Sequence, residues 1–197
     1  MSKVYTSIDQ LIGHTPLLEV TTIQPADILA ARVLVKLEYF NPAGSAKDRI
    51  AKAMLDEAER TGKIRRNDGY TIIEPTSGNT GVGLSRVAAA RGYRRVITIT
   101  DAMSGEPPSR LRSRGADLVE SPGPLGMKGA IAKAEELPRE PPKIMIAGQF
   151  VTPANPAIHE ATTGPEIWED TDGKVDILVA GGGTGGTMTR NREKNKK

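Results

Sequence analysis

Short, largely apolar segments alternate with amphipathic ones along most of this chain, and this alternation is the feature that most constrains its fold. Strands of this kind are typical of parallel sheets, because helices cover such sheets on both faces. The expected strands span residues 33–38, 70–74, 96–100, 116–119, 143–147 and 175–180. We therefore predict an α/β fold with parallel sheets flanked by helices.

Helical patterns fill the stretches between these strands. They predict a helix from Lys47 to about residues 60–62, a helix through residues 84–88, and further helices over 111–114, 129–137 and from 163 onward. Charged residues make up 26% of the 197 residues and hydrophobic ones 38%, which is typical of a chain that folds around a core. With no membrane-length apolar run and no signal-peptide pattern, we expect a cytoplasmic protein without membrane contact.

The basic charge is concentrated at the end of the chain. The formal net charge is +3, and residues 190–197 alone carry five cations and one anion, which leaves the body close to −1. We expect this tail to be disordered and the body not to bind nucleic acid. The chain has no cysteine, and His14 and His159 are too far apart in sequence to form a metal-ligand spacing, so no metal site is expected.

A turn over residues 39–46 leads directly into the helical pattern that begins at Lys47. Ser45 and Asp48 have the spacing of a capping box, which would place Lys47 in the first helical turn. A cation there faces the positive end of the helix dipole, so we expect a lowered pKa and a more nucleophilic amine. The alternative from this spacing alone is a lysine that reaches into water.

Two further loops follow strands and precede helical patterns. Residues 76–81 offer consecutive backbone N–H groups and hydroxyls at a helix N-terminus, a site for a small anion such as a carboxylate. A glycine-rich turn capped by Thr76 or Ser77 is the alternative. Residues 181–187 contain five glycines, which let backbone N–H groups close on a phosphate. A dinucleotide site is not expected, because only eleven residues follow Gly186 and the motif needs an acidic residue about 20 positions further on.

The lysine turn, the anion loop and the phosphate loop, in this order, resemble the pyridoxal-phosphate enzymes of fold type II, most closely the cysteine synthases (O-acetylserine sulfhydrylases). The likeness runs from residue 8 to about residue 189. It includes the motifs at residues 12–17, 41–49, 74–81, 126–130, 149–150, 153–156 and 162–168. Cystathionine β-synthase is the related alternative, and residues 126–129 and 153–156 favour a cysteine synthase.

The resemblance implies a role for each loop. Lys47 would bind pyridoxal 5′-phosphate covalently and later move the Cα proton of the substrate. The cofactor's 3′ oxygen would bind Asn79, and its phosphate would bind Gly183, Thr184, Gly185, Gly186 and Thr187. The substrate carboxylate would bind Thr76, Ser77, Asn79, Thr80 and Gln149. The implied reaction is a β-replacement, in which O-acetylserine loses acetate and sulfide adds to give cysteine.

The resemblance also implies a two-lobed architecture. A small mobile domain would span residues 41–149, while residues 1–40 and 150–189 would belong to a large domain that is incomplete here. The family implies a homodimer and a possible complex with the C-terminus of serine acetyltransferase. Because the chain is shorter than usual family members, the alternative is a non-catalytic remnant that binds an amino acid or a protein partner.

Overall fold

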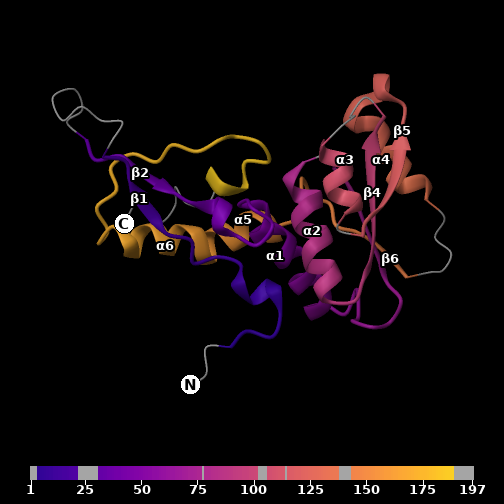
Figure 1. Cartoon of the computed structure of the whole chain (residues 1–197), viewed down its shortest axis with the longest axis horizontal. Helices are drawn as coiled ribbons and strands as arrows, with labels where there is room; N and C mark the ends of the chain where they lie inside the picture. The colour runs from indigo at the N-terminus through magenta and orange to yellow at the C-terminus, as the bar shows by residue number, and fades with distance from the viewer. Residues whose placement is uncertain are drawn as a thin grey trace.

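The computed structural model describes residues 4–21, 31–76, 78–101, 106–113, 115–137 and 143–188. Two groups of elements are visible in Figure 1. Strands β4, β5 and β6 with helices α2, α3 and α4 lie on the right, and β1, β2, α5 and α6 lie toward the left. The expectations for Ser77 and for the tail at 190–197 lie outside the described residues.

Four of the predicted strands form one parallel sheet. They are β3 (Thr71–Pro75), β4 (Arg94–Thr100), β5 (Asp117–Ser121) and β6 (Ile144–Ile146), in the order β5-β4-β3-β6. Ile73 of β3 pairs with Val96 on one side and with Ile146 on the other. The α/β class and the parallel sheet flanked by helices are therefore confirmed.

Helices cover both faces of this sheet. They are α2 (Asn79–Ala90), α3 (Glu106–Arg112) and α4 (Gly126–Glu136). Ile97 and Ile99 of β4 are buried in one cluster with Val82 of α2 and Leu111 of α3. Thr98 between them points to the opposite face, where its hydroxyl donates to the Ala130 carbonyl of α4 at 2.8 Å. Helices α2 and α3 therefore lie on one face and α4 on the other, as side-chain alternation along a strand requires.

The predicted helix at Lys47 is α1 (Lys47–Arg60), and its apolar face is fully buried. Ile50, Met54, Leu55 and Ala58 lie in one core cluster with side chains of α2. The first turn of α1 approaches α2 closely at Gly83, where an added Cβ would lie 3.2 Å from the Lys47 carbonyl. This close contact fixes the start of α1 against the first turns of α2.

A small separate sheet differs from the prediction. Strand β2 (Leu34–Lys36), from the predicted segment 33–38, pairs antiparallel with β1 (Leu17–Glu19), and Leu18 lies opposite Val35. The expectation of parallel pairing is wrong here, because β2 finds its hydrogen-bond partners in the preceding strand of the chain rather than in the parallel sheet.

The strand predicted at residues 175–180 is also wrong, since this described segment has no regular secondary structure. Ile177 and Val179 are 79% and 89% exposed, so their apolar character does not reflect burial here. An extended segment becomes a strand only when a neighbouring strand accepts and donates its backbone hydrogen bonds. No strand among the described residues pairs with the segment at residues 175–180.

The remaining elements are short. They are the 3-10 turns at Ile8–Leu11, Glu38–Phe40 and Gly123–Leu125, α5 (Ala154–Ile158), a π-helical turn (His159–Thr163) and α6 (Gly164–Asp170), which carries Trp168. Helix α3 starts at Glu106, five residues before the predicted Leu111, because Pro107 and Pro108 fall in its first turn, where proline is tolerated. Within the described part of the chain, no helix combines the length and apolarity that crossing a membrane requires.

Candidate active site

Lys47 is the first residue of α1, as the sequence predicts, but the cap differs from the predicted capping box. The N-cap residue is Ala46, and Ser45 Oγ accepts the Lys47 N–H at 3.2 Å. The Asp48 carboxylate accepts the N–H of Ala43 at 2.5 Å, and the Ser45 hydroxyl accepts from Lys47 rather than from Asp48, so the reciprocal capping box does not form. The reason is geometric, because the chain already enters a helical conformation at Ala46 and Asp48 then reaches back into the preceding turn.

The turn before Lys47 is tied to the N-terminal segment of the chain. Asn41 Oδ1 accepts the Gly13 N–H at 2.8 Å, and Asn41 Nδ2 donates to Glu38 at 2.9 Å. These contacts join the motif at residues 12–17 to the motif at residues 41–49. The start of α1 is therefore held from two directions, by this turn and by α2.

A buried arginine, two residues after Lys47 in the first turn of α1, strengthens this support. Arg49 donates to Glu38 at 2.8 Å and to Glu166 of α6 at 2.7 Å, and its side chain is only 1% exposed. Hydrogen bonds from Arg49 and Lys36 outweigh the burial that raises the pKa of Glu166, and they lower that pKa to about 2. The cluster fixes the base of α1 against α6 through charge-assisted bonds.

The Lys47 side chain is half-buried, and this burial lowers its pKa, since desolvation disfavours the ammonium ion. The predicted direction of the shift is therefore confirmed. The cause is removal from water, whereas the sequence argument attributed the shift to the helix dipole. An amine with a lowered pKa is more often neutral and thus a better nucleophile.

The second loop lies at the N-terminus of α2, next to the start of α1. The Gly78 N–H donates to Thr76 Oγ1 at 3.2 Å within the turn. The N-cap residue of α2 is Gly78, so the alternative in which Thr76 caps this helix is wrong. Asn79 is exposed in the first turn of α2. The buried Thr80 hydroxyl donates to Gln149 Oε1 at 2.5 Å. Thr80 and Gln149, two predicted carboxylate ligands far apart in sequence, are therefore in direct contact.

A buried carboxylate holds the backbone beside Gln149. Glu74, near the end of β3, is completely buried and accepts the N–H groups of Gly148 at 2.7 Å and Gln149 at 3.4 Å. Burial raises the pKa of Glu74 to about 7. Glu74 thus fixes the turn after β6.

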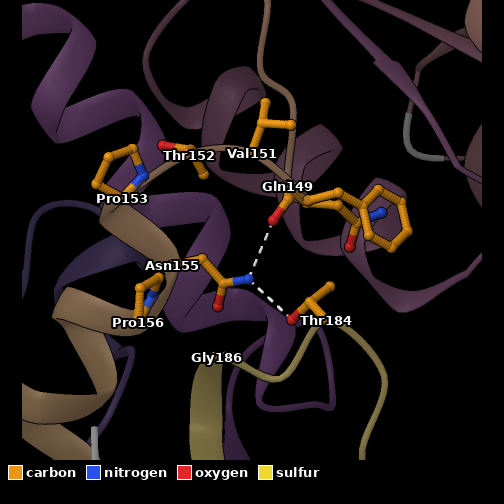
Figure 2. Close-up of a pocket in the computed structure, with 9 residues that line it drawn as sticks. Gln149, Val151, Thr152, Pro153, Asn155, Pro156, Thr184 and Gly186 are labelled. Carbon is orange, nitrogen blue, oxygen red and sulfur yellow. Dashed lines mark hydrogen bonds between the residues drawn. The ribbon is translucent and has the colours of Figure 1, made fainter. Parts of the chain in front are cut away.

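The glycine-rich loop meets this turn through Asn155, as Figure 2 shows. Asn155 Nδ2 donates to the Gln149 carbonyl at 3.0 Å and to Thr184 Oγ1 at 2.9 Å. A cavity of about 240 Å³ lies here. It is lined by Gln149, Phe150, Val151, Thr152, Pro153, Asn155, Pro156, Thr184 and Gly186. The glycine-rich loop and the turn at Gln149 therefore border one cavity.

His159 lies beneath the same loop and is completely buried. Its Nδ1 lies 2.9 Å from Thr163 Oγ1, and its Nε2 lies 3.3 Å from Thr187 Oγ1. Burial, and then the charges of Arg49 and Lys47, lower the pKa of His159 to about 4, so the imidazole is neutral at pH 7. A neutral ring can donate from one nitrogen and accept at the other, which suits two hydroxyl neighbours.

The structure thus brings the three predicted loops into one region. Lys47 starts a helix packed on α2, Thr80 of α2 contacts Gln149, and Gln149 connects through Asn155 to residues 184–186. Sequence reasoning missed Asn155, although the motif at residues 153–156 contains it. It also missed Glu74 and His159, because a buried polar residue gives no periodic signal of its own.

Comparison with known proteins gives the family. A family model described as pyridoxal-phosphate dependent enzyme matches residues 8–189. The chain belongs to this family of pyridoxal-phosphate-dependent enzymes. The match spans the lysine turn, the anion loop and the glycine-rich loop. Confirmation of the family supports the choice of fold type II from the same motifs.

Relatives in this family are cysteine synthases and a sulfide-producing enzyme. The chain is 50% identical over 190 residues to cysteine synthase A of Salmonella typhi, covering 96% of this chain and 57% of the relative. A crystal structure of a hydrogen sulfide-producing enzyme from Fusobacterium nucleatum superposes with a TM-score of 0.91 at 38% identity, covering 100% of this chain and 63% of that one. For cysteine synthase from Entamoeba histolytica, the TM-score is 0.89 at 43% identity, with 98% and 57% covered. The chain thus spans about three-fifths of the length of these relatives.

Proposed function

We propose that this chain carries the catalytic lysine, the carboxylate site and the phosphate site of a pyridoxal-phosphate-dependent cysteine synthase. The proposed reaction is the β-replacement of acetate in O-acetyl-L-serine by sulfide, which gives L-cysteine. One observation carries the proposal: the contacts from Thr80 through Gln149 and Asn155 to Thr184 join the proposed substrate and phosphate sites. The names of the relatives support the choice of substrates.

The residues present fit pyridoxal 5′-phosphate. Added Cβ atoms at Gly181, Gly182 and Gly183 would have no heavy atom within 4 Å, so the backbone of this loop is open to a phosphate. We propose that residues 183–187 hold the phosphate and that Asn79 binds the 3′ oxygen.

The proposed roles of the side chains follow from where they lie. When bound, the cofactor supplies the electron sink that allows the substrate Cα–H bond to break. Lys47 binds the cofactor covalently and then holds and moves the Cα proton, and its lowered pKa suits this proton transfer. Residues 76–80 and Gln149 orient the substrate carboxylate, and the hydroxyl of Thr80 fixes the Gln149 side chain.

We also propose the domain division and partners that the family implies. Residues 41–149 would form the small mobile domain, and residues 1–40 and 150–189 would belong to the large one. A homodimer, a complex with serine acetyltransferase and a cytoplasmic location are part of this proposal. The large share of the relatives' length that this chain does not span makes the oligomeric state a quantity to measure directly.

The test is to purify the chain with pyridoxal phosphate, reduce it with borohydride and locate the adduct by mass spectrometry. We expect a stoichiometric pyridoxyl mark on Lys47 and none in Lys47→Ala. Lys63→Ala is the control, because it removes an exposed lysine from the turn that follows the same helix. Assays with O-acetylserine and sulfide then measure cysteine formation.

A folded chain whose Lys47 remains unmarked at saturating pyridoxal phosphate would contradict the proposal. Marking of several exposed lysines to the same extent as Lys47 would contradict it too, because that result indicates surface chemistry without a site.

A further inference from the structure

We propose that Asn155 is a positioning residue that transmits cofactor binding at the phosphate loop to the turn that binds the substrate. The inference rests on the proposed function, because it takes residues 183–187 as the phosphate site and Gln149 as a carboxylate ligand. It assigns to Asn155 an effect on substrate binding without contact with the substrate.

The Asn155 side chain uses both hydrogens of its amide group to join two segments. One hydrogen goes to the main-chain carbonyl of Gln149 at 3.0 Å and the other to the Thr184 hydroxyl at 2.9 Å. Figure 2 shows the side chain between these two groups, with Gly186 below it. Asn155 is only 2% exposed, so water does not replace these bonds at low cost.

Packing restricts the motion of this bridge, by which we mean the two hydrogen bonds from Asn155 to Gln149 and Thr184. An added Cβ at Gly186 would lie 2.2 Å from Asn155 Oδ1, so the loop backbone is pressed against the amide. The loop cannot move toward Asn155, and it cannot move away without stretching the bond to Thr184. Displacement of the loop therefore displaces Asn155 and, through it, the carbonyl of Gln149.

Gln149 has three anchors, and only one of them leads to the loop among the contacts of the described residues. Glu74 accepts its N–H, and Thr80 donates to its side chain, which ties Gln149 to β3 and to α2. Asn155 donates to its carbonyl and also contacts Thr184. The bridge therefore connects the glycine-rich loop to a turn otherwise held by the four-stranded sheet and its helices.

A phosphate that orders the loop will also order the turn through this bridge. A first ligand that restricts motion reduces the ordering that a second ligand must produce, which gives positive coupling between the two sites. Binding of pyridoxal phosphate should thus prepare the Gln149 side chain for the substrate carboxylate before the substrate arrives.

The test measures hydrogen–deuterium exchange in two segments of the full chain, with and without pyridoxal phosphate. The segments are the glycine-rich loop at residues 181–187 and the turn at residues 148–152. In the wild-type chain we expect pyridoxal phosphate to slow exchange in both. In Asn155→Ala we expect slowing in the loop, while the slowing in the turn falls by about five-fold or more, as the loss of a buried hydrogen bond predicts.

Two further variants distinguish the loss of the Asn155 hydrogen bonds from a general loss of stability. Asn155→Asp keeps the shape of the side chain but has no N–H to donate, so it should lose the effect in the turn even if Asn155→Ala does not fold. Thr98→Val also removes a buried hydrogen bond from a side chain to a main-chain carbonyl, but in the sheet. It should leave the response of the turn to pyridoxal phosphate unchanged. All variants are compared at concentrations that protect the loop equally.

The outcomes distinguish this inference from the proposed function. If the loop is protected but the turn responds equally in wild type and in both Asn155 variants, the bridge is refuted and the proposed function stands. The bridge is also refuted if the wild-type turn does not respond to pyridoxal phosphate at all. It is refuted too if no concentration of pyridoxal phosphate protects the loop in the Asn155 variants. If the wild-type loop is not protected and Lys47 gains no pyridoxyl mark, both are refuted.

Discussion

Replacing Glu74 with glutamine should change how the stability of this protein depends on pH. Glu74 is completely buried, and burial raises its pKa from 4.5 to about 7. At about 1.4 kcal/mol per pH unit, this rise corresponds to about 3 to 4 kcal/mol in favour of the neutral acid in the folded state. That contribution is fully present below pH 4.5 and is lost as the pH rises through 7. Glutamine has nearly the same shape and cannot ionise.

The measurement is urea unfolding, followed by far-ultraviolet circular dichroism at pH 5 and pH 8. From pH 5 to pH 8, we expect the free energy of unfolding of wild type to fall by about 2 to 3 kcal/mol more than that of Glu74→Gln. The urea midpoint of wild type should therefore fall by about 1 M more than that of the variant. The absolute stability of the variant can be lower at pH 5, since its amide accepts only one of the two N–H groups.

Glu135→Gln provides the control, because it makes the same side-chain change at an exposed position on α4. If the profiles of wild type and Glu74→Gln run parallel from pH 5 to pH 8, the reasoning is refuted. Glu74 would then be ionised in the folded protein at little cost, and burial would not govern its titration.

Three further outcomes follow from the site. Gly186→Ala should weaken pyridoxal phosphate binding at least about ten-fold in an absorbance titration, because its Cβ would overlap Asn155, whereas Gly182→Ala has open space and should bind normally. Arg49→Met should lower the free energy of unfolding by about 3 kcal/mol in urea, since it removes the buried guanidinium that pairs with Glu38, while Glu166 keeps its contact with Lys36. The buried imidazole of His159 should give the nitrogen chemical shifts of a neutral ring at pH 6, because its pKa is lowered to about 4, and its contribution to stability should disappear as the pH falls from 6.5 through 4. Normal pyridoxal phosphate binding by Gly186→Ala would contradict the first of these arguments. An unchanged urea midpoint for Arg49→Met would contradict the second, and a cationic His159 ring at pH 6 would contradict the third.

The parallel sheet and its helices could be predicted because their signals are local. Residues 96–100 form a continuous run of β-branched side chains, and α1 repeats its apolar positions at helical spacing. The segment at residues 175–180 has the same local signal but lacks a pairing partner among the described residues, so the prediction fails. The pairing of β2 with β1 depends on a long-range choice of partner that composition does not encode.

The candidate site shows the same division between local and long-range information. The lysine turn and the glycine-rich loop could be found because glycine, proline and charge at fixed spacing reflect local backbone demands. Asn155 and Glu74 act through contacts with residues 29 and 74 positions away, respectively, and only the folded chain reveals such contacts.

Trp168 is the single tryptophan of the chain, and its position on α6 determines what fluorescence can report. The indole is 46% exposed and lies against Gly173, where an added Cβ would be 2.9 Å from the ring. Its emission will therefore follow the loosening of α6 and will not respond directly to the four-stranded sheet. Circular dichroism follows both groups of elements, so a difference between the two unfolding curves would measure how independently the two halves of this molecule melt.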